Sequence, residues 1–551
     1  MLQVFNWPKA YISCFAYNDE TKELIAGAND GAIKLWDAES ASVINTFRGH
    51  IDRINVVKFG IKKNTIISAS EDQTIKVWNK ATAKTMHTFF PVGNADFLNQ
   101  ISSGYYKSSP GASRSLHYVS TDLKPITFNQ LDVKYNRPDK VLKEMGSTDT
   151  ALIAAYHKAY LKRVKKIGVD TSAFSSNFNL PQADFINRDQ IASDQKENLV
   201  QLHIKGIDSL AFIDRFNIWV NEIPIFGMKG FSLKSRKTHN IDTTITLSLS
   251  YGVNQLETSI VNVNGTESYR MPMIVNYKPD KHPIEKLYFI GIGIDEFVQN
   301  QNNLKWSVKD IRDQAKALQL KYGENISIDT LFNKEVTVKN IIALKEKLKT
   351  TTVNDKVILA YSGHGLLSKD YDYFLSTYAI NFDKPEENGL PYDALEDLLD
   401  HIPARKKLML IDACHSGEVD KEELLKFTAA QKKLDSNRVE GSKGVKVTNN
   451  GQKKTSMKSS LELMQQLFVN VSQSTGATVI SAAAGTQFAL EKNDLKNGVF
   501  SFSILEYLKA NNHATVTDLK NYVNKRVEEL TSGLQVPTAR SEMKVTNWNV
   551  W

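Results

Sequence analysis

The chain has very little cysteine, since Cys14 and Cys414 are the only two among its 551 residues. A secreted protein held together by a disulfide framework would need more than this one widely separated pair. No run of about 18 apolar residues occurs, and the N-terminus lacks a basic segment followed by an apolar one. These absences predict a cytoplasmic protein with no membrane partner.

An excess of charge of one sign is also missing. The formal net charge of +8 is modest for this length, and part of it lies in one Lys-rich segment. We therefore expect no nucleic-acid partner. Hydrophobic residues make up 41% and aromatic residues 9% of the chain, which excludes a mostly disordered protein. The length predicts three or more domains.

An internal repeat opens the chain. The segments GAIKLWD and QTIKVWN contain Trp36 and Trp78, which are 42 residues apart, and the pair Gly49-His50 lies between them. This is the period of a propeller blade, and residues 1–90 resemble two WD40 repeats. Closed propellers have about four to eight blades, so two blades cannot bury their own faces. Either the chain is the end of a longer propeller or the blades pack on something else.

Two further segments separate this repeat from the rest of the chain. Residues 91–171 are predicted to form a connector that contains a helix over residues 148–164. Over residues 172–279 the hydrophobic period changes to two, as in the segment from Val200 to Ile204. That alternation predicts a small antiparallel β-sandwich, immunoglobulin-like, with a spacing or docking function.

Residues 280–551 alternate short apolar strands with amphipathic helices, which predicts an α/β domain with a mostly parallel sheet. Reactive groups gather at the carboxyl ends of strands in such sheets. The predicted strands are Leu287 to Gly293, Val357 to Tyr361, Leu408 to Ile411 and Thr478 to Ile480, and the predicted helices are Ser307 to Lys321, Val338 to Leu348, Tyr392 to Ile402 and Val499 to Leu508.

Two motifs follow two of these strands. KVILAYS runs into Gly363-His364-Gly365, and KKLMLI runs into DACHSG, which contains Cys414 fifty residues after His364. An imidazole can assist deprotonation of a thiol and then protonate the leaving amine. We therefore expect Cys414 as nucleophile and His364 as acid/base. The backbone amides of Gly365 and Cys414 are the candidate oxyanion donors.

The paired motifs SGHG and DACHSG resemble the caspase superfamily, and the metacaspase-like branch more than the animal caspases. The resemblance covers residues 284–551, and together with the WD40 repeats it is similar to bacterial WD40-caspase proteins. It implies a cysteine endopeptidase that acts on a protein or peptide. It also implies that Asp412 and Asp310 line a pocket for Arg or Lys, because a buried pair of carboxylates is costly unless it meets a cation.

The same resemblance implies further substrate-binding positions. Ser481, Ala482 and Ala484 match the segment that pairs its backbone with the substrate, and Glu491 is a further candidate acid for the pocket. We expect no metal and no cofactor, since the acidic residues of the loop around residues 370–386 lack the spacing of a calcium loop.

Plainer interpretations remain open for each of these residues. Free cysteine is often buried, so Cys414 alone could be a core residue. The adjacent His415 is interpreted as structural, because His364 already fills the role of the base. Asp412 could cap the turn after its strand, and Asp310 could be an ordinary acid in the first turn of a helix.

Residues 418–460 are polar and Lys-rich, which predicts a flexible basic loop. A protease that prefers basic residues would find sites there, so we expect self-cleavage between Lys432 and Lys458.

The leading hypothesis is a cytoplasmic cysteine endopeptidase whose blades or sandwich recognise a protein partner or restrain the protease. One alternative is a catalytically inert caspase-like and WD40 scaffold. Another is a recognition module whose main function lies in the WD40 segment.

Overall fold

The computed structural model describes residues 4–7, 10–119, 123, 125–174, 179–368, 372–413, 439–442, 475–483, 489–541 and 547–551. The chain forms two compact units. The first consists of Met1–Lys165, Val169–Phe178 and Asn264–Tyr269, and the second of Lys166–Gly168, Asn179–Val263 and Arg270–Trp551. No helix among the described residues is long and apolar enough to cross a membrane.

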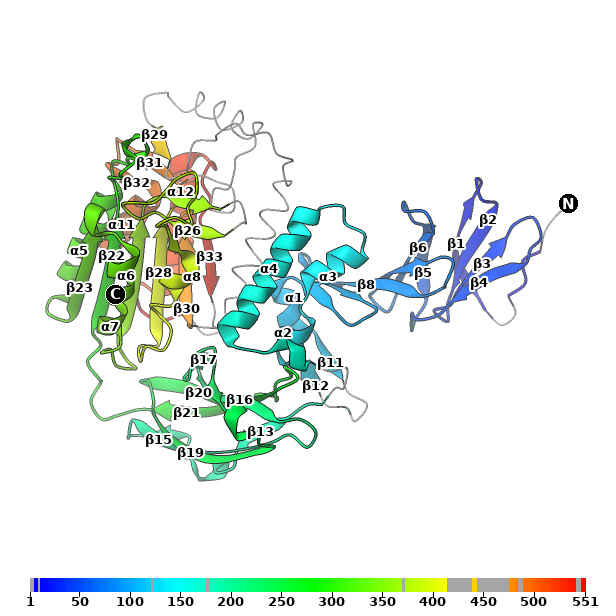
Figure 1. The fold of residues 1–551 in the computed structure, drawn as a ribbon, viewed down its shortest axis with the longest axis horizontal. Coiled ribbons are helices and arrows are strands. Elements are labelled where there is room, and N and C mark those ends of the chain that lie inside the picture. Colours follow the sequence, from blue (N-terminus) through cyan, green and yellow to red (C-terminus); the bar gives the residue numbers. More distant parts are fainter. Residues whose placement is uncertain are drawn as a thin grey trace. The chain divides into compact units, whose positions relative to one another are not determined.

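Two antiparallel sheets begin the first unit (Figure 1). One sheet contains β1 (Ile12–Asn18), β2 (Glu23–Ala28), β3 (Ile33–Asp37) and β4 (Val43–Phe47), and the other contains β5 (Ile54–Phe59), β6 (Thr65–Ser70), β7 (Ile75–Asn79), β8 (Thr85–Val92), β9 (Asp96–Ile101) and β10 (Tyr106–Ser108). They share a core in which Ile25 and Phe47 of the first sheet are buried with Ile54 and Trp78 of the second. Cys14 lies at this contact, with its thiol sulfur 3.5 Å from the carbonyl oxygen of Ile54.

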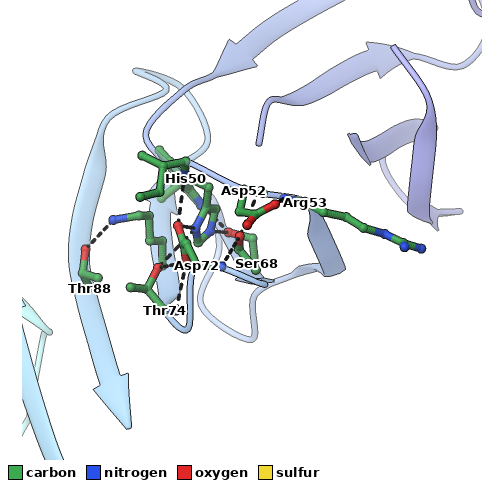
Figure 2. Close-up of polar contacts among 11 residues, drawn as sticks. His50, Asp52, Arg53, Ser68, Asp72, Thr74 and Thr88 are labelled. Atoms are coloured by element: carbon green, nitrogen blue, oxygen red, sulfur yellow. Dashed lines mark hydrogen bonds and ion pairs between the residues drawn. The ribbon is translucent and has the colours of Figure 1, made fainter. Parts of the chain in front are cut away.

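A chain of hydrogen bonds crosses the second sheet, and Figure 2 shows much of it around His50. Trp78 Nε1 donates to Ser68 Oγ at 2.8 Å, Ser68 Oγ lies 2.8 Å from His50 Nε2, and His50 Nδ1 lies 2.7 Å from Asp72 Oδ2. Thr74 donates to Asp72 from its amide and from its hydroxyl. Because a carboxylate only accepts, His50 carries its proton on Nδ1 and accepts from Ser68 at Nε2.

The predicted connector supplies β9 and β10 to the second sheet and then short helices with one small hairpin. These elements are α1 (Pro110–Ser115), β11 (His117–Val119), β12 (Pro125–Thr127), α2 (Phe128–Tyr135), α3 (Pro138–Glu144) and α4 (Thr150–Ile167). The predicted helix over residues 148–164 corresponds to α4.

A β-sandwich starts the main part of the second unit. One sheet has β13 (Gln182–Phe185), β15 (Leu199–Ile207) and β19 (Asn240–Ser248), and the other has β14 (Asp194–Gln195), β21 (Met273–Tyr277), β20 (Gly252–Asn262), β16 (Ile213–Val220), β17 (Ile223–Pro224) and β18 (Phe231–Ser232). The pairing is antiparallel apart from the short β14–β21 pair. Val200, Leu202 and Ile204 of β15 point into the shared core, as their alternation predicts.

The C-terminal domain is built on a six-stranded sheet with the order β23-β22-β24-β28-β30-β33. Its strands are β23 (Ile326–Phe332), β22 (Leu287–Gly293), β24 (Lys356–Ser362), β28 (Lys406–Asp412), β30 (Ala477–Ser481) and β33 (Thr538–Ser541). All neighbours pair in parallel except β30 with β33. The predicted mostly parallel sheet, and with it the multidomain β, β-sandwich and α/β fold class, is confirmed.

Helices cover both faces of this sheet. Successive residues of each strand point to opposite faces, so every strand contributes to two hydrophobic cores. Phe289 and Ile358 lie in one core with Ile311 and Leu505, and the next residue of each strand lies in the other core. The α-helices among the described residues of this domain are α5 (Ser307–Tyr322), α6 (Val338–Ala343), α7 (Lys345–Leu348), α8 (Tyr392–Glu396), α11 (Val499–Ala510) and α12 (Val516–Thr531).

Among the described residues, this domain also has two small antiparallel sheets. One contains β25 (Gly365–Leu367), β26 (Tyr373–Leu375) and β27 (Leu390–Pro391), and the other contains β29 (Val439–Ser442), β31 (Leu490–Lys492) and β32 (Asn497–Gly498). Strand β29 falls within residues 418–460, predicted as a flexible basic loop. The rest of that segment, with the expected cleavage sites near Lys432 and Lys458, lies outside the described residues.

The sandwich contacts the C-terminal domain through polar groups inside the second unit. Arg405 is buried and donates to the carbonyl oxygen of Ser248 at 2.7 Å and to Ser250 Oγ at 2.8 Å. His401 Nε2 donates to the carbonyl oxygen of Phe226 at 3.0 Å. These hydrogen bonds join the two domains.

Candidate active site

The candidate site lies at the carboxyl ends of the two central strands, β24 and β28. These strands pair in parallel with Ser362 opposite Asp412, and the amide of Gly363 donates to the carbonyl oxygen of Asp412 at 3.2 Å. His364 and Cys414 each stand two residues beyond this pair in the sequence. The structure describes His364, whereas Cys414 and His415 lie outside the described residues.

The His364 ring is buried and oriented by a backbone carbonyl. Its Nε2 lies 2.8 Å from the carbonyl oxygen of Asn302. A carbonyl oxygen only accepts, so Nε2 carries the proton in the neutral imidazole and Nδ1 is the basic nitrogen. The rings of Phe297 and Phe382 flank the imidazole, with centroids 5.3 Å and 5.4 Å away. The arrangement fixes both the tautomer and the plane of the ring.

The backbone around His364 is fixed by Ser376. The His364 amide donates to Ser376 Oγ at 3.0 Å, and the Ser376 amide donates to the His364 carbonyl oxygen at 2.9 Å. A Cβ on Gly363 would lie 2.6 Å from the Tyr361 hydroxyl, so this position has no room for a side chain. Gly365 is buried at the start of β25, opposite Leu375 of β26.

Asp310 is fully buried on α5, and its carboxylate faces the end of β24 and the short strand β32. Its Oδ2 accepts from Ser362 Oγ at 3.1 Å, and its Oδ1 accepts from Asn497 Nδ2 at 2.9 Å and from the amide of Gly498 at 3.0 Å. These donors come from β24 and β32. The carboxylate thus ties α5 to the strand end that precedes His364.

Asp412 is buried at the last position of β28, and its Oδ2 accepts from Ser501 Oγ on α11 at 2.7 Å. Ser501 in turn accepts from Gln314 Nε2 on α5 at 3.3 Å. Gln314 lies one helical turn after Asp310. We call Asp310, Gln314, Ser362, Asp412, Asn497 and Ser501 the carboxylate cluster.

The other predicted substrate-binding residues lie around this cluster. Ser481 ends β30, and the Ala482 amide donates to the carbonyl oxygen of Ile411 at 2.8 Å. The Ala482 carbonyl oxygen accepts from Gln535 Nε2 at 2.8 Å. Ala484 lies outside the described residues.

Glu491 is buried on β31 and accepts from the amides of Lys305 and Trp306 at 3.2 Å and 3.1 Å. These two residues directly precede α5. The position of Glu491 therefore fixes the start of the helix that carries Asp310.

Sequence reasoning missed Asn302, Gln314, Asn497 and the hydrogen-bonding role of Ser501. Ser501 lies in the predicted helix Val499 to Leu508, so that helix was the signal available. Asn302 acts through its backbone carbonyl, which no side-chain pattern reveals. Within the described ranges, no group of three or more His, Cys, Asp or Glu residues could hold a metal ion.

Comparison with known families agrees with this geometry, because residues 290–547 match the model of the caspase domain, Peptidase C14. These residues form a caspase domain. Residues 1–37 and 41–79 match the WD40 repeat, so the caspase domain follows WD40 repeats in this chain. The predicted resemblance to the caspase superfamily and to WD40 repeats is confirmed.

Individual relatives are more distant. Metacaspase-1 from the yeast Meyerozyma guilliermondii is 26% identical over 142 residues, which cover 23% of this chain and 34% of that protein. The chain thus spans about a third of the length of this curated relative. Protein GSU0716 from Geobacter sulfurreducens has 17% identity and a TM-score of 0.31, covering 46% of this chain and 93% of that one. The structure of U3-55K has 24% identity and a TM-score of 0.15, covering 18% and 34%.

Proposed function

We propose that the caspase domain is a cysteine endopeptidase that cleaves after Arg or Lys, with Cys414 as nucleophile and His364 as acid/base. The observation that carries the proposal is the in-register pair Ser362–Asp412, because it sets His364 and Cys414 at equal distances along the chain beyond two neighbouring strand ends. A caspase domain in a chain with two cysteines also fits a reducing, cytoplasmic compartment.

The chemistry follows from the tautomer of His364. With the proton of Nε2 directed at Asn302, Nδ1 is the nitrogen that takes the thiol proton of Cys414. The thiolate attacks the scissile carbonyl, and the imidazolium then returns the proton to the leaving amine. The amides of Gly365 and Cys414 are the proposed donors to the oxyanion, a contribution typically worth about 100- to 1000-fold in rate.

The carboxylate cluster supports basic specificity at P1, the residue before the cut bond. Asp310 on α5 and Asp412 at the end of β28 are both buried, and a substrate guanidinium or ammonium would offset the cost of burying two carboxylates. An acidic P1 residue would instead meet like charge in a poorly solvated pocket. We therefore expect Arg and Lys peptides to be cleaved at least about 100-fold better than Asp peptides.

Fluorogenic peptides ending in Arg, Lys or Asp test the proposal on the full chain. Cys414→Ala should abolish turnover, and His364→Ala should lower it at least about 1000-fold, because nucleophile and base act as a unit. His415→Ala is the matched control and should keep its turnover.

Turnover that survives Cys414→Ala would contradict the nucleophile assignment. Equal loss in His415→Ala and His364→Ala would contradict the choice of base. A wild-type chain that cleaves none of the three peptides would support the inert scaffold instead.

A further inference from the structure

The two WD40-like sheets correspond strand by strand with an offset of 42 residues. The β1–β2 pairing is irregular between Ile12 and Cys14, and the β5–β6 pairing is irregular between Ile54 and Val56. Each residue of the first sheet therefore has a counterpart 42 positions later that points the same way. This correspondence allows the surroundings of equivalent positions to be compared directly.

In the second sheet, the face toward the first sheet is buried. Ile54 is 0% exposed and Val57 is 3% exposed, and both lie in the core shared with Ile25 and Leu35. This is the sheet-to-sheet contact that the chain itself makes. We call this side of the second sheet its upper face, and we use the same name for the equivalent side of the first sheet.

In the first sheet, the upper face is open. Ile12 is 50% exposed, Phe15 72% and Tyr17 50%, although their counterparts are Ile54, Val57 and the half-buried Phe59. Farther out on the same sheet, Phe5 and Trp7 cover Trp36, with ring centroids 6.0 Å and 5.6 Å away. The open surface is thus an apolar patch on β1, where three bulky side chains lie on one face.

The opposite side of the two-sheet pair is open as well. Cys14, Ala16 and Ile25 lie on the side of the first sheet that packs against the second sheet. We call this side of each sheet the lower face. The counterparts of these residues on the second sheet are Val56 at 45%, the exposed Lys58, and Ile67 at 37% exposure. The pair of sheets therefore exposes an upper face at one end and a lower face at the other.

We propose that copies of this chain associate head to tail, with the upper face of one copy on the lower face of the next. A second copy is the occupant because the chain itself exposes both halves of a contact that it already makes internally. Lys58 is the charged residue of the lower-face set, and its ammonium can lie over the rings of Phe15 or Tyr17 of the neighbour.

Such a heterologous contact closes into a ring when its rotation divides a full turn. Closed propellers have about four to eight blades, and each chain brings two, so the ring would contain about two to four copies. The association does not depend on the proposed protease activity.

The test is the molar mass of the full chain by light scattering after size-exclusion chromatography, from about 1 to about 100 µM. The wild type should reach two to four times the mass of one chain. Phe15→Lys on the upper face and Ile67→Lys on the lower face should each give single chains. Ile61→Lys replaces an exposed apolar residue outside the two faces and should associate like the wild type.

Mixing the two variants distinguishes head-to-tail packing from every other arrangement. Phe15→Lys keeps an intact lower face and Ile67→Lys keeps an intact upper face, so a 1:1 mixture should form a dimer that grows no further. A monomeric wild type would overturn the proposal, and so would association that survives either variant or a mixture that stays monomeric. If the exposed faces instead bind a blade of a different WD40 protein, the purified wild type would be monomeric, which is the outcome that overturns the proposal.

Discussion

At the scale of single residues, the carboxylate cluster shows how the two acids are held. Asp310 has donors from Ser362, Asn497 and the Gly498 amide, whereas Asp412 takes the hydroxyl of Ser501. Gln314 donates to the same Ser501 oxygen, which leaves the hydroxyl proton directed at Asp412. We infer that Ser501 is a positioning residue for the Asp412 carboxylate.

Replacing Ser501 by Ala should lower kcat/KM for Arg peptides about 10- to 100-fold, since a hydrogen bond to a charged group contributes about 1.5–3 kcal/mol. Ser501→Thr keeps the hydroxyl and should restore most of the activity. The measurement is kcat/KM for Arg peptides and for peptides with a neutral P1 residue, with the larger loss expected for Arg.

Ser503→Ala is the matched control for this change. Ser503 is a buried serine on the same helix, and its hydroxyl donates to the carbonyl oxygen of Val499 at 2.8 Å. Equal losses in Ser501→Ala and Ser503→Ala would show a general effect of destabilising α11 and would contradict the positioning role.

The sequence predicted His364 and Asp412 from motifs at the ends of two strands, β24 and β28. Asp310, in the first turn of α5, was predicted from the family resemblance. The sequence could not identify Gln314 or Asn497, since their contacts join α5 to segments about 190 residues later in the chain. Such contacts depend on how the helices pack on the sheet, and no local pattern records that packing.

At the scale of elements, the hydrogen-bond chain of the second sheet (Figure 2) joins β6, β7 and the turn before β5. Burial lowers the pKa of His50, which favours the neutral ring. Burial alone would raise the pKa of Asp72, but hydrogen bonds from Thr74, His50 and Ile51 outweigh it and lower that pKa. Both shifts favour the neutral-histidine, charged-aspartate state.

Asp72→Asn should therefore destabilise the second sheet by about 1–3 kcal/mol, because an amide cannot accept all the hydrogen bonds of the carboxylate. Hydrogen exchange of the β6 and β7 amides measures the change locally. Asp52→Asn is the control, since Asp52 is exposed and its carboxylate accepts the neighbouring Arg53 amide. Unchanged protection in Asp72→Asn would contradict a structural role for the network.

The sequence predicted where helices occur more accurately than where they end. The predicted helix Tyr392 to Ile402 ends at Glu396 in the structure, and residues 397–401 form turns. Leu395, Leu398 and Leu399 are buried in the same core, so the apolar period continues past the last helical residue. His401 adopts a φ of 58°, a left-handed conformation that a right-handed helix excludes.

At the scale of the whole molecule, the sandwich and the caspase domain share one compact unit. Composition and periodicity predict a separate sandwich and α/β domain here, but they say nothing of the bonds between them. Arg405 lies in the segment ARKK, which reads as an exposed basic stretch, yet its guanidinium is buried and burial lowers its pKa to about 10. Arg405 is buried by contact with the sandwich, and the residues next to Arg405 in the sequence give no sign of that contact.

His401 makes this contact depend on pH. Its Nδ1 lies 2.8 Å from Asp400 Oδ2, and this hydrogen bond raises the pKa of His401 against the opposing effects of burial and nearby Lys345. Because the pKa of His401 is raised in the folded protein, protonation of this ring stabilises the fold. The contribution is complete below the unfolded-state pKa of about 6.5 and is lost as the pH rises through the folded-state pKa. The sandwich–protease contact should therefore weaken above neutral pH.

The expected contribution is a few tenths of a kcal/mol, because the ring is about half exposed. Protection factors for the amides around Phe226, compared at about pH 6 and about pH 8, should fall more in the wild type than in His401→Gln. His513→Gln, an exposed histidine elsewhere, is the control and should behave like the wild type. Equal pH dependence in His401→Gln and the wild type would rule out this histidine as the source.

The position of Cys14 between the two WD40-like sheets has a practical consequence for thiol chemistry. Burial raises the pKa of its thiol, so little of it is thiolate near neutral pH, and thiolate is the form that alkylating reagents attack. The chain has one other cysteine, Cys414. A native sample thus responds to mild alkylation nearly as a single-thiol protein, and the stoichiometry of fast labelling counts the molecules whose Cys414 is reactive.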